Sequence, residues 1–470
     1  MERGRRSVAL PPGPPRSPLS ALVYRPGGNP LLFFSDLARK YGDVAHVRMA
    51  SERVYLLTHP RFVRDVLVTH QHNFRKGRGL ERAKRLLGEG LLTSEGAVHV
   101  RQRRLMQPAF HRDRIAGYAT VMTEYAERIQ RRWRDGATLD VAQEMMRLTL
   151  GIVGKTLFDQ DVEAQAHEVG AALNDVMESF WMQMLPFYNT LERLPIPALR
   201  RARIARDRLD AIIYRMIAER RRAPDDRGDL LSMLLMAQDE EDDRRGMTDT
   251  QVRDEAMTIF LAGHETTANA LSWTWYLLDG APEVAARLHA EVDRVLEGRP
   301  PTLADVPRLP YVEQVVTESM RLYPPAWLIG RRAINDYAID DYVAPARSVI
   351  VMSPYLLHRD GRFFPDPERF MPERWTADFK ASLPPFAYFP FGGGARRCIG
   401  ESFAWMELIL VVSAIAQRWA FSLVPGHLVV PQPVVTLRLK HGLKMVAHER
   451  RASAPAGESP VGVSPDPGGT

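Results

Sequence analysis

The sequence predicts a mainly α-helical protein with a smaller β-rich part. Three observations lead to this fold class. Helical patterns of apolar residues dominate positions 101–296, prolines and short strand-like runs follow Pro324, and a long apolar helix resumes over residues 401–419. Since no internal repeat and no shift in composition divides the body of the chain, we expect one large mixed domain.

The predicted domain covers residues 29–450 of the 470-residue chain. A proline-rich segment, residues 1–28, precedes it, and the run PPGPP at 11–15 comes before any apolar stretch of anchor length. Residues 451–470 are rich in Pro, Gly and Ser, so we expect this tail to be disordered.

Local patterns predict the individual elements. Apolar positions within 31–37 predict a first helix, after which Val44, Val47 and Met49 alternate as in a strand and residues 54–57 form a second strand. Further along, we expect helix breaks at Gly136, Pro186, Pro195, Pro224 and the acidic run 239–243, and a strand at 348–352.

The stretch 256–278 is long enough to cross a membrane and contains no Lys or Arg. His264 and Glu265 lie in its middle, where lipid would make them costly. Thr248 and Gln251 offer an N-terminal cap just before it. We therefore predict a buried central helix in a protein without a membrane anchor.

Composition limits the compartment and the partners. The chain has 63 Lys and Arg against 57 Asp and Glu, and this net charge of +6 over a large surface does not indicate nucleic-acid binding. A single cysteine cannot form an intramolecular disulfide, which fits a reducing compartment. We expect a cytoplasmic monomer.

The one cysteine, Cys398, follows a cluster of glycines and precedes a predicted helix. Glycines allow positive φ and close backbone approach, so the loop can fold tightly under a flat cofactor and aim N–H groups at the sulfur. Those donors and the positive end of the helix stabilise a thiolate. Taken alone, a lone cysteine beside a glycine-rich turn is more often a buried structural residue than a metal ligand.

The whole loop resembles the haem-binding loop of the cytochrome P-450 family, F-G-x-G-x-R-x-C-x-G. The resemblance covers about residues 11–448. It implies the cytochrome P-450 fold and a haem b cofactor between the long central helix and the helix of the cysteine loop. Cys398 would be the axial ligand of the iron. The matching positions are Phe391, Gly394, Arg396, Cys398 and Gly400.

The central helix contains Ala262-Gly263-His264-Glu265-Thr266-Thr267, which resembles the family motif A-G-x-[DE]-T-[TS]. The resemblance implies that the small residues Ala262 and Gly263 leave space above the haem. The Thr266 hydroxyl would donate to dioxygen, and Glu265 would relay protons from solvent. Without the resemblance, a glycine and two threonines fit helix packing about equally well.

Glu318 and Arg321, three apart on a predicted helix, resemble the family's E-x-x-R pair. In the family this pair is buried and is joined by an arginine from a P-E-R-F-like segment. We predict Arg374 in that place, and Arg369 in the neighbouring P-E-R-F copy remains an alternative.

Haem propionates are anionic and need cationic or hydrogen-bonding partners. By resemblance these partners are His99, Arg103, Arg331 and Arg396, and Arg332 remains open as an alternative to Arg331. His99 stands where many relatives carry Trp, and it still offers an N–H donor.

The resemblance implies a monooxygenase that inserts one oxygen atom of dioxygen into an apolar substrate, either a fatty acid or a terpenoid. A peroxide-using haem enzyme is less favoured, because Thr266 and Glu265 are both present, and a haem-based sensor is the alternative outside enzymes. By resemblance, apolar and aromatic residues such as Trp327 line the substrate pocket, within 70–98, 179–191, 260–266, 326–329 and 434–437.

The electrons would reach the haem through a ferredoxin or flavodoxin from an NAD(P)H-dependent reductase. We expect this partner to be acidic and to dock on the cysteine side of the haem. The basic residues expected there are Arg101, Arg104, Arg112, Arg114 and Arg397.

Overall fold

The computed structural model describes residues 10–15, 28–49, 52–159, 172, 196–223, 225–238 and 246–450. Several expectations lie outside these residues. They are the breaks at Pro186, Pro195, Pro224 and 239–243, the tail 451–470 and most of the segment 1–28.

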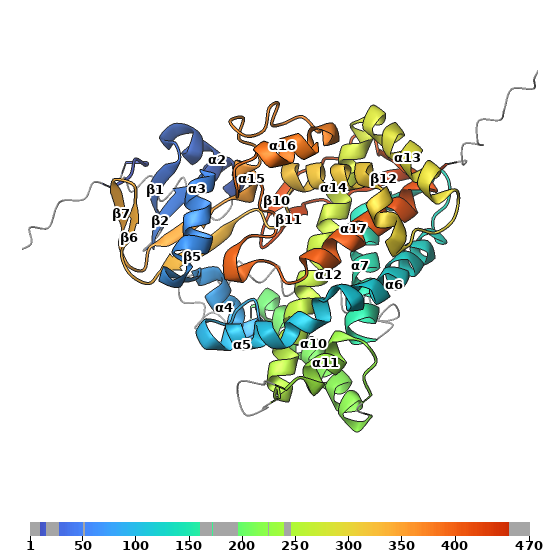
Figure 1. Ribbon diagram of the computed structural model, residues 1–470, viewed down its shortest axis with the longest axis horizontal. Helices are drawn as coiled ribbons and strands as arrows, with labels where there is room; N and C mark the ends of the chain where they lie inside the picture. Colours follow the sequence, from blue (N-terminus) through green and yellow to red (C-terminus); the bar gives the residue numbers. More distant parts are fainter. Residues whose placement is uncertain are drawn as a thin grey trace, which may run out of the picture.

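Helices fill one side of the molecule and the five-stranded sheet lies on the other, while β12 lies among the helices, and this arrangement confirms the mainly helical fold class (Figure 1). Helix α12 runs through the middle, beside α7 and α17, and α10 and α11 lie below it. The helices are α2 (Pro30–Tyr41), α3 (Pro60–Arg64), α4 (Arg78–Leu87), α5 (Gly96–Met106), α6 (Arg112–Gln130), α7 (Val141–Phe158), α10 (Pro197–Arg222), α11 (Leu230–Met236), α12 (Asp249–Asp279), α13 (Pro282–Leu296), α14 (Pro310–Leu322), α15 (Pro354–Leu357), α16 (Ala377–Ser382) and α17 (Glu401–Ala416).

The strands form one five-stranded sheet, in the order β1-β2-β8-β5-β3, one three-stranded sheet, β4-β12-β9, and the pairs β10-β11 and β6-β7. Only β2 and β8 run parallel within the described pairings. The strands are β1 (Val44–Met49), β2 (Glu52–Leu57), β3 (Phe74–Lys76), β4 (Thr138–Asp140), β5 (Ile329–Ala333), β6 (Tyr337–Ile339), β7 (Tyr342–Ala344), β8 (Val349–Met352), β9 (Trp419–Leu423), β10 (Pro431–Pro433), β11 (Leu437–Leu439) and β12 (Lys444–Glu449).

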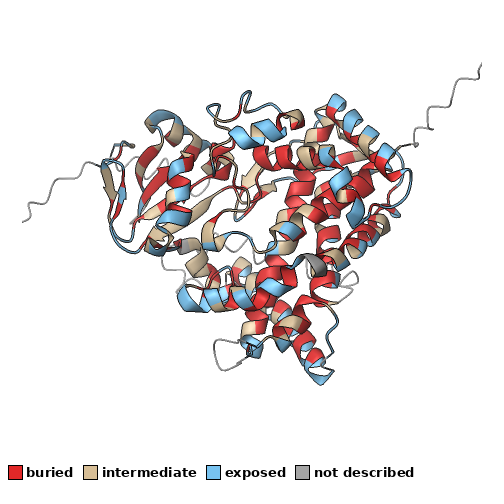
Figure 2. Cartoon of the chain, in the orientation of Figure 1, coloured by how far each residue is buried: buried red, intermediate tan, exposed pale blue. Residues whose placement is uncertain are grey.

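The predicted central helix is α12, and it begins where the cap was expected. Thr248 accepts from the backbone N–H of Gln251, and the Gln251 side chain accepts from the backbone N–H of Thr248, which makes a capping box. Most of α12 and α17 is buried (Figure 2). Among the described residues, no helix is long and apolar enough to cross a membrane.

Two elements differ from expectation. The apolar run 401–419 was expected to be one helix, but α17 ends at Ala416, and Trp419 begins β9, where it pairs with Glu449 of β12. Strand β4 follows Gly136 inside the region expected to be helical, and it also pairs with β12. Both strands exist because of a partner more than twenty residues away, which local periodicity does not reveal.

Candidate active site

The cysteine loop is folded tightly against the turn that follows α3. Gly392 and Gly394 have φ of 71° and 65°, a region that strongly favours glycine. A Cβ on Gly394 would lie 1.9 Å from the carbonyl oxygen of Leu67. The loop is closed by the backbone N–H of Cys398, which donates to the carbonyl of Phe391 at 3.0 Å. The backbone conformation therefore favours glycine at both positions, and the protein's own packing requires it at Gly394.

Cys398 is exposed at the end of the loop. Burial raises the pKa of its thiol above the ordinary value, and the backbone N–H of Gly400 lowers it. A Cβ on Gly400 would make only an ordinary contact with Phe110, at 3.7 Å, so protein packing alone does not require glycine there.

The middle of α12 is open on one face. Ala262 is exposed, and Gly263 and Thr266 are half-buried, although their neighbours along the helix are buried. The Thr266 hydroxyl donates to the carbonyl of Ala262 at 2.7 Å. Gly263 also has a packing role, because a Cβ there would lie 2.9 Å from a methyl group of Val153 on α7.

Glu265 points away from that open face. Its carboxylate is buried and accepts from Arg438 at 2.7 Å and from the hydroxyl of Thr436. Burial by itself raises the pKa of Glu265, but the hydrogen bond and charge of Arg438 outweigh it and hold the pKa below its ordinary value. Neither Arg438 nor Thr436 was singled out from the sequence, because the local pattern shows no link between β11 and α12.

Glu318 is the centre of a buried ion cluster on α14. Its two oxygens accept from Arg321 at 2.8 and 2.9 Å and from Arg374 at 2.9 Å. Trp375 Nε1 and the backbone N–H of Met371 complete the set, at 2.8 and 3.0 Å. Every lone-pair direction of this carboxylate therefore has a donor.

Of the two arginines left open by the sequence, Arg374 makes the ion pair. Arg369 contributes only its backbone carbonyl, which accepts from Arg321 at 3.1 Å. Arg321 also donates to the carbonyl of His358, at 2.8 Å, and the His358 ring accepts from the backbone N–H of Phe389 at 2.9 Å. The cluster thereby supports the segment that enters the cysteine loop.

Comparison with known proteins decides the family. The model of the family Cytochrome P-450 matches residues 11–443. The chain belongs to the cytochrome P-450 family. It is therefore a monooxygenase, and its cofactor is haem.

Relatives and solved structures agree with this assignment. Cyclooctatin synthase of Streptomyces melanosporofaciens is 42% identical over 92% of this chain and 94% of its own length. Pentalenene oxygenase of Streptomyces avermitilis is 36% identical over 87% of this chain and 90% of its own length. The crystal structure of the cytochrome P-450DA haem domain superposes with a TM-score of 0.86 at 29% identity, covering 95% of this chain and 99% of that one.

A cluster of one buried and two half-buried cations near the cysteine loop fits the propionates of haem. Arg331 and Lys76 are paired across strands β5 and β3, and Arg396 lies close enough to lower the pKa of both. Glu95, bonded to Arg396, is the carboxylate that faces this group. The cluster thus carries excess positive charge, which the two carboxylates of haem would neutralise.

Arg331 is the cation with the fewest partners. Burial, followed by the charge of Arg396, lowers its pKa to about 10. Among the described residues its guanidinium donates only to the carbonyl of Gly330, at 3.0 Å. Arg332 points elsewhere, with Nη1 at 3.6 Å from Glu81 and Nε donating to the carbonyl of Arg347. Arg331 is therefore the better candidate for a propionate contact.

In this structure the side chains of His99 and Arg103 contact backbone carbonyls of the protein. The His99 ring lies 3.2 Å from the carbonyl of Leu91 and 3.5 Å from that of Ala395. Burial and the charge of Arg396 lower the pKa of His99 to about 4, so the ring is neutral and has a single N–H. Arg103 donates to the carbonyl of Arg397 at 2.7 Å. Both residues tie α5 to the cysteine loop.

Lys76 was not identified as a site residue from the sequence. Its ammonium is buried and donates to the carbonyls of Leu91 and Leu92, at 2.8 Å for Leu91. Burial, followed by the charge of Arg396, lowers its pKa to about 6. Lys76 is linked to the site by its place opposite Arg331. The sequence does not reveal this place, because it depends on the pairing of β3 with β5.

The walls expected around the substrate are partly described. Phe260 is buried and stacks on Phe158 with ring centroids 4.2 Å apart. The expectation for Trp327 is wrong, because this side chain packs into a core cluster beside Phe34 and donates to the carbonyl of Val434 at 3.0 Å. Segment 179–191 lies outside the described residues.

Proposed function

We propose that this cytochrome P-450 inserts one oxygen atom into an apolar terpenoid. The observation that carries the proposal is the open face of α12, where Ala262 and Thr266 are accessible in the middle of a buried helix. Three relatives support the substrate class, since their names refer to cyclooctatin, cyclooctat-9-en-7-ol and pentalenene, which are terpenoids. A fatty acid is the second candidate.

In this proposal the residues around the haem have distinct tasks. Cys398 would bind the iron, and the haem would supply the activation of dioxygen, from which the inserted oxygen atom comes. Ala262 leaves room for substrate. The Thr266 hydroxyl, which donates to the carbonyl of Ala262 in this structure, turns from that carbonyl to donate a hydrogen bond toward the dioxygen site. Glu265 relays protons, and Arg331 and Arg396 bind the propionates.

The substrate class is tested by ligand binding. Cyclic terpene hydrocarbons and alcohols, and fatty acids of matched carbon number, are titrated into the haem-loaded protein while the haem absorption band is followed. We expect the terpenoids to shift the band at much lower concentration. A shift caused by fatty acids alone would contradict the terpenoid assignment.

The ligand assignment is tested with Cys398→Ala, which we expect to lose the carbon monoxide band typical of a thiolate ligand. Ile399→Ala changes the next side chain and keeps the thiol, so the control should retain the band. Retention of the band by Cys398→Ala would show that another group binds the iron.

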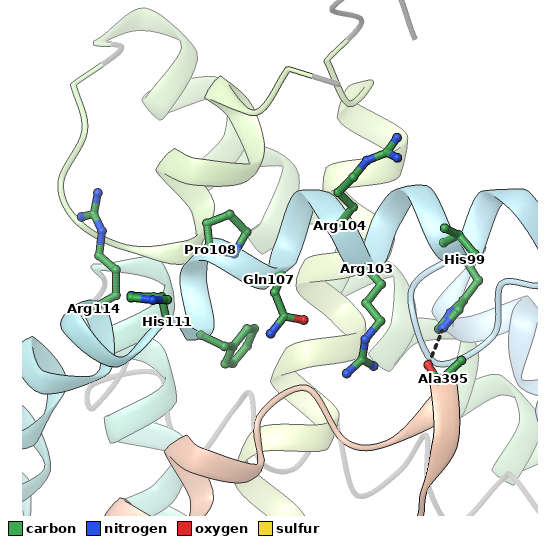
Figure 3. A pocket seen from close by; sticks show the side chains of 10 residues that line it. His99, Arg103, Arg104, Gln107, Pro108, His111, Arg114 and Ala395 are labelled. Atoms are coloured by element: carbon green, nitrogen blue, oxygen red, sulfur yellow. Dashed lines mark hydrogen bonds between the residues drawn. The ribbon is translucent and has the colours of Figure 1, made fainter. Parts of the chain in front are cut away.

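A hollow of about 1110 Å³ lies between α5, the start of α6 and the cysteine loop. Figure 3 shows Arg103 pointing from α5 toward the loop, Arg104 pointing away from it, and His111 and Arg114 at the far end. None of the described residues that line the hollow is acidic. They are His99, Val100, Arg103, Arg104, Gln107, Pro108, Phe110, His111, Arg114 and Ala395.

We propose that an acidic ferredoxin or flavodoxin docks at this hollow, in the cytoplasm, and delivers electrons from its reductase. Val100 is 61% exposed at the rim and offers an apolar contact beside the exposed Arg104. Arg114 and Arg397 contribute less charge than expected, because they pair with Asp226 at 3.0 Å and with Glu401 at 2.5 Å. The Arg112 side chain lies outside the described part of the chain.

Arg104→Glu should slow electron transfer from an acidic ferredoxin, most strongly at low ionic strength. Arg134→Glu, an exposed arginine that follows α6, is the control and should leave the rate unchanged. Equal rates for Arg104→Glu and wild type at every salt concentration would exclude this docking surface.

A further inference from the structure

Helix α10 concentrates the positive charge of the chain. Its 26 residues include nine arginines, no lysine and three acidic residues, which leaves the helix with a net charge of +6. The whole chain has the same net charge of +6 at pH 7, so all the rest of the sequence is neutral in sum. The basic excess of this protein is therefore collected on one helix rather than spread over its surface.

One face of α10 packs into the protein. Its apolar residues Leu209, Ile213 and Ile217 are buried in the main core cluster, and the helix lies against α12. Arg220 is on this inner face as well, where it donates to Asp229 from both Nη atoms at 2.7 Å. This face and its one buried arginine hold the helix in place.

The opposite face carries a row of exposed arginines. Four of them are spaced by eight, seven and seven residues, which is close to two helical turns each time, so their side chains leave the same side of the helix. At a rise of 1.5 Å per residue the row is about 33 Å long. This arginine row consists of Arg200, Arg208, Arg215 and Arg222.

The acidic residues of α10 neutralise little of the arginine row. Asp210 accepts from Nε of Arg253 on α12 at 2.7 Å, and Asp207 lies 3.5 Å from Arg206, which is outside the row. Glu219 is exposed near the end of the helix. The outer face of α10 thus presents excess positive charge, and an anionic surface would be attracted to it.

Three features favour a lipid surface over an acidic protein. Every cation of α10 is an arginine, whose planar guanidinium forms paired hydrogen bonds with phosphate. The charge follows a line along the helix, which suits a plane better than a compact patch would. Ile204, between Arg200 and Arg208, and Tyr214 are each 41% exposed on the outer face, and such side chains enter the boundary between headgroups and acyl chains.

We propose that the arginine row of α10 binds the surface of a membrane that contains anionic phospholipids, with the helix axis parallel to that surface. This attachment is peripheral and requires no helix that crosses the bilayer. It goes beyond the proposed function. Attachment would also place the enzyme beside the phase in which an apolar terpenoid dissolves, and this consequence alone rests on the proposed function.

The test is sedimentation of the haem-loaded protein with vesicles of phosphatidylcholine alone or of phosphatidylcholine mixed with phosphatidylglycerol. We expect binding to the mixed vesicles only, and weaker binding as salt is added. One arginine near an anionic bilayer contributes about fivefold to the binding constant. The double variant Arg200→Gln/Arg215→Gln should therefore bind about thirtyfold more weakly.

A matched control removes the same number of charges elsewhere. Arg53→Gln/Arg64→Gln changes two exposed arginines of β2 and α3, on the strand-rich side of the molecule and away from α10 (Figure 1). We expect this control to bind as the wild type does, and both double variants to keep the haem absorption spectrum. An equal loss of binding in the two double variants would overturn the proposal, because net charge alone would then explain it.

Two further results decide the kind of partner. Ile204→Ser/Tyr214→Ser should weaken the binding that persists at high salt, whereas Leu428→Ser, at a side chain 70% exposed between β9 and β10, should not. If α10 binds an acidic protein instead, the wild type will sediment with neither kind of vesicle, and Arg200→Gln/Arg215→Gln will slow electron transfer from an acidic ferredoxin. Absence of sedimentation with the mixed vesicles would by itself overturn the proposal.

Discussion

Two regions of this molecule gather several charges in buried or half-buried positions, and they balance these charges differently. Around Glu318, one carboxylate is surrounded by Arg321, Arg374 and the indole N–H of Trp375, and the remaining guanidinium hydrogens reach backbone carbonyls. Around Arg331, three cations gather near the carboxylate of Glu95, and the second carboxyl group near Lys76, that of Glu255, has a pKa raised by burial to about 8 and is mostly neutral at pH 7. In the first region every charged group has its partners within the protein, whereas the second region keeps excess positive charge.

This difference separates a structural cluster from a binding site. A buried ion cluster with all its hydrogen bonds made holds chain segments together, and removal of one member leaves the others uncompensated. A group of like charges away from solvent is unfavourable until an anion neutralises it. This neutralisation adds to the free energy with which the anion binds. The same residue type, arginine, thus stabilises the fold in one region and prepares a site for an anionic group in the other.

The largest expected effect is that of Glu318→Ala. It strands Arg321 and Arg374 and should lower the free energy of unfolding of the haem-free protein by about 3–5 kcal/mol. Denaturant unfolding measures this loss. Glu449→Ala, which breaks the exposed pair with Arg418, is the control and should cost less than about 1 kcal/mol. A similarly small loss for both variants would show that the Glu318 cluster stabilises the fold no more than an exposed ion pair does.

Arg331→Gln should lower the affinity for haem rather than the stability of the haem-free protein. We expect the haem-free protein to keep or gain stability, because a like charge is removed, while haem affinity falls by about 1.5–3 kcal/mol, roughly tenfold to a hundredfold. Transfer of haem to a scavenger protein measures the affinity. Arg332→Gln alters the neighbouring side chain near Glu81 and should leave haem retention unchanged. Strong destabilisation with normal haem retention would place Arg331 among the structural residues.

The pH dependence of the haem-free protein tests Lys76. Its pKa is about 6 in the folded chain against an ordinary 10.5, so the unfolded chain binds more protons between these values. The contribution of Lys76 to stability should therefore rise with pH across this window, by up to about 1.4 kcal/mol per unit. Glu255, whose pKa is raised to about 8, contributes with the opposite sign at the lower end of the window, so the test is that the slope becomes less positive in Lys76→Met. Binding of haem should raise the pKa of Lys76 and take up a proton near neutral pH, which calorimetry in two buffers detects. An unchanged slope in Lys76→Met would disprove the assignment.

The smallest expected effect concerns Glu407 of α17, a second fully buried carboxyl. Burial raises its pKa well above the ordinary value, so it is neutral, unlike a carboxylate paired with two arginines. Glu407→Gln replaces one neutral group by another and should change the free energy of unfolding by about 1 kcal/mol or less. Glu318→Gln should cost more than twice as much. Equal losses would contradict the view that only Glu318 is part of an ion cluster.

The sequence by itself determined the features that depend on near neighbours. The capping box at Thr248 and Gln251 and the glycine turns before Cys398 involve residues within four positions of each other, so residue type and spacing are enough to predict them. The family motifs were equally readable, since each is a short contiguous segment. The overall class, mainly helical with a smaller β-rich part, followed from long apolar periods in the same way.

Only the tertiary structure decided which distant groups meet. Arg374 rather than Arg369 reaches Glu318, and Arg331 rather than Arg332 faces Arg396, because neighbouring residues of a turn or strand point in different directions and the packing selects one of them. The pairing of Glu265 with Arg438 joins positions 173 residues apart. Contacts of this kind depend on how α12 and β11 pack together, and no local pattern of residues encodes that arrangement.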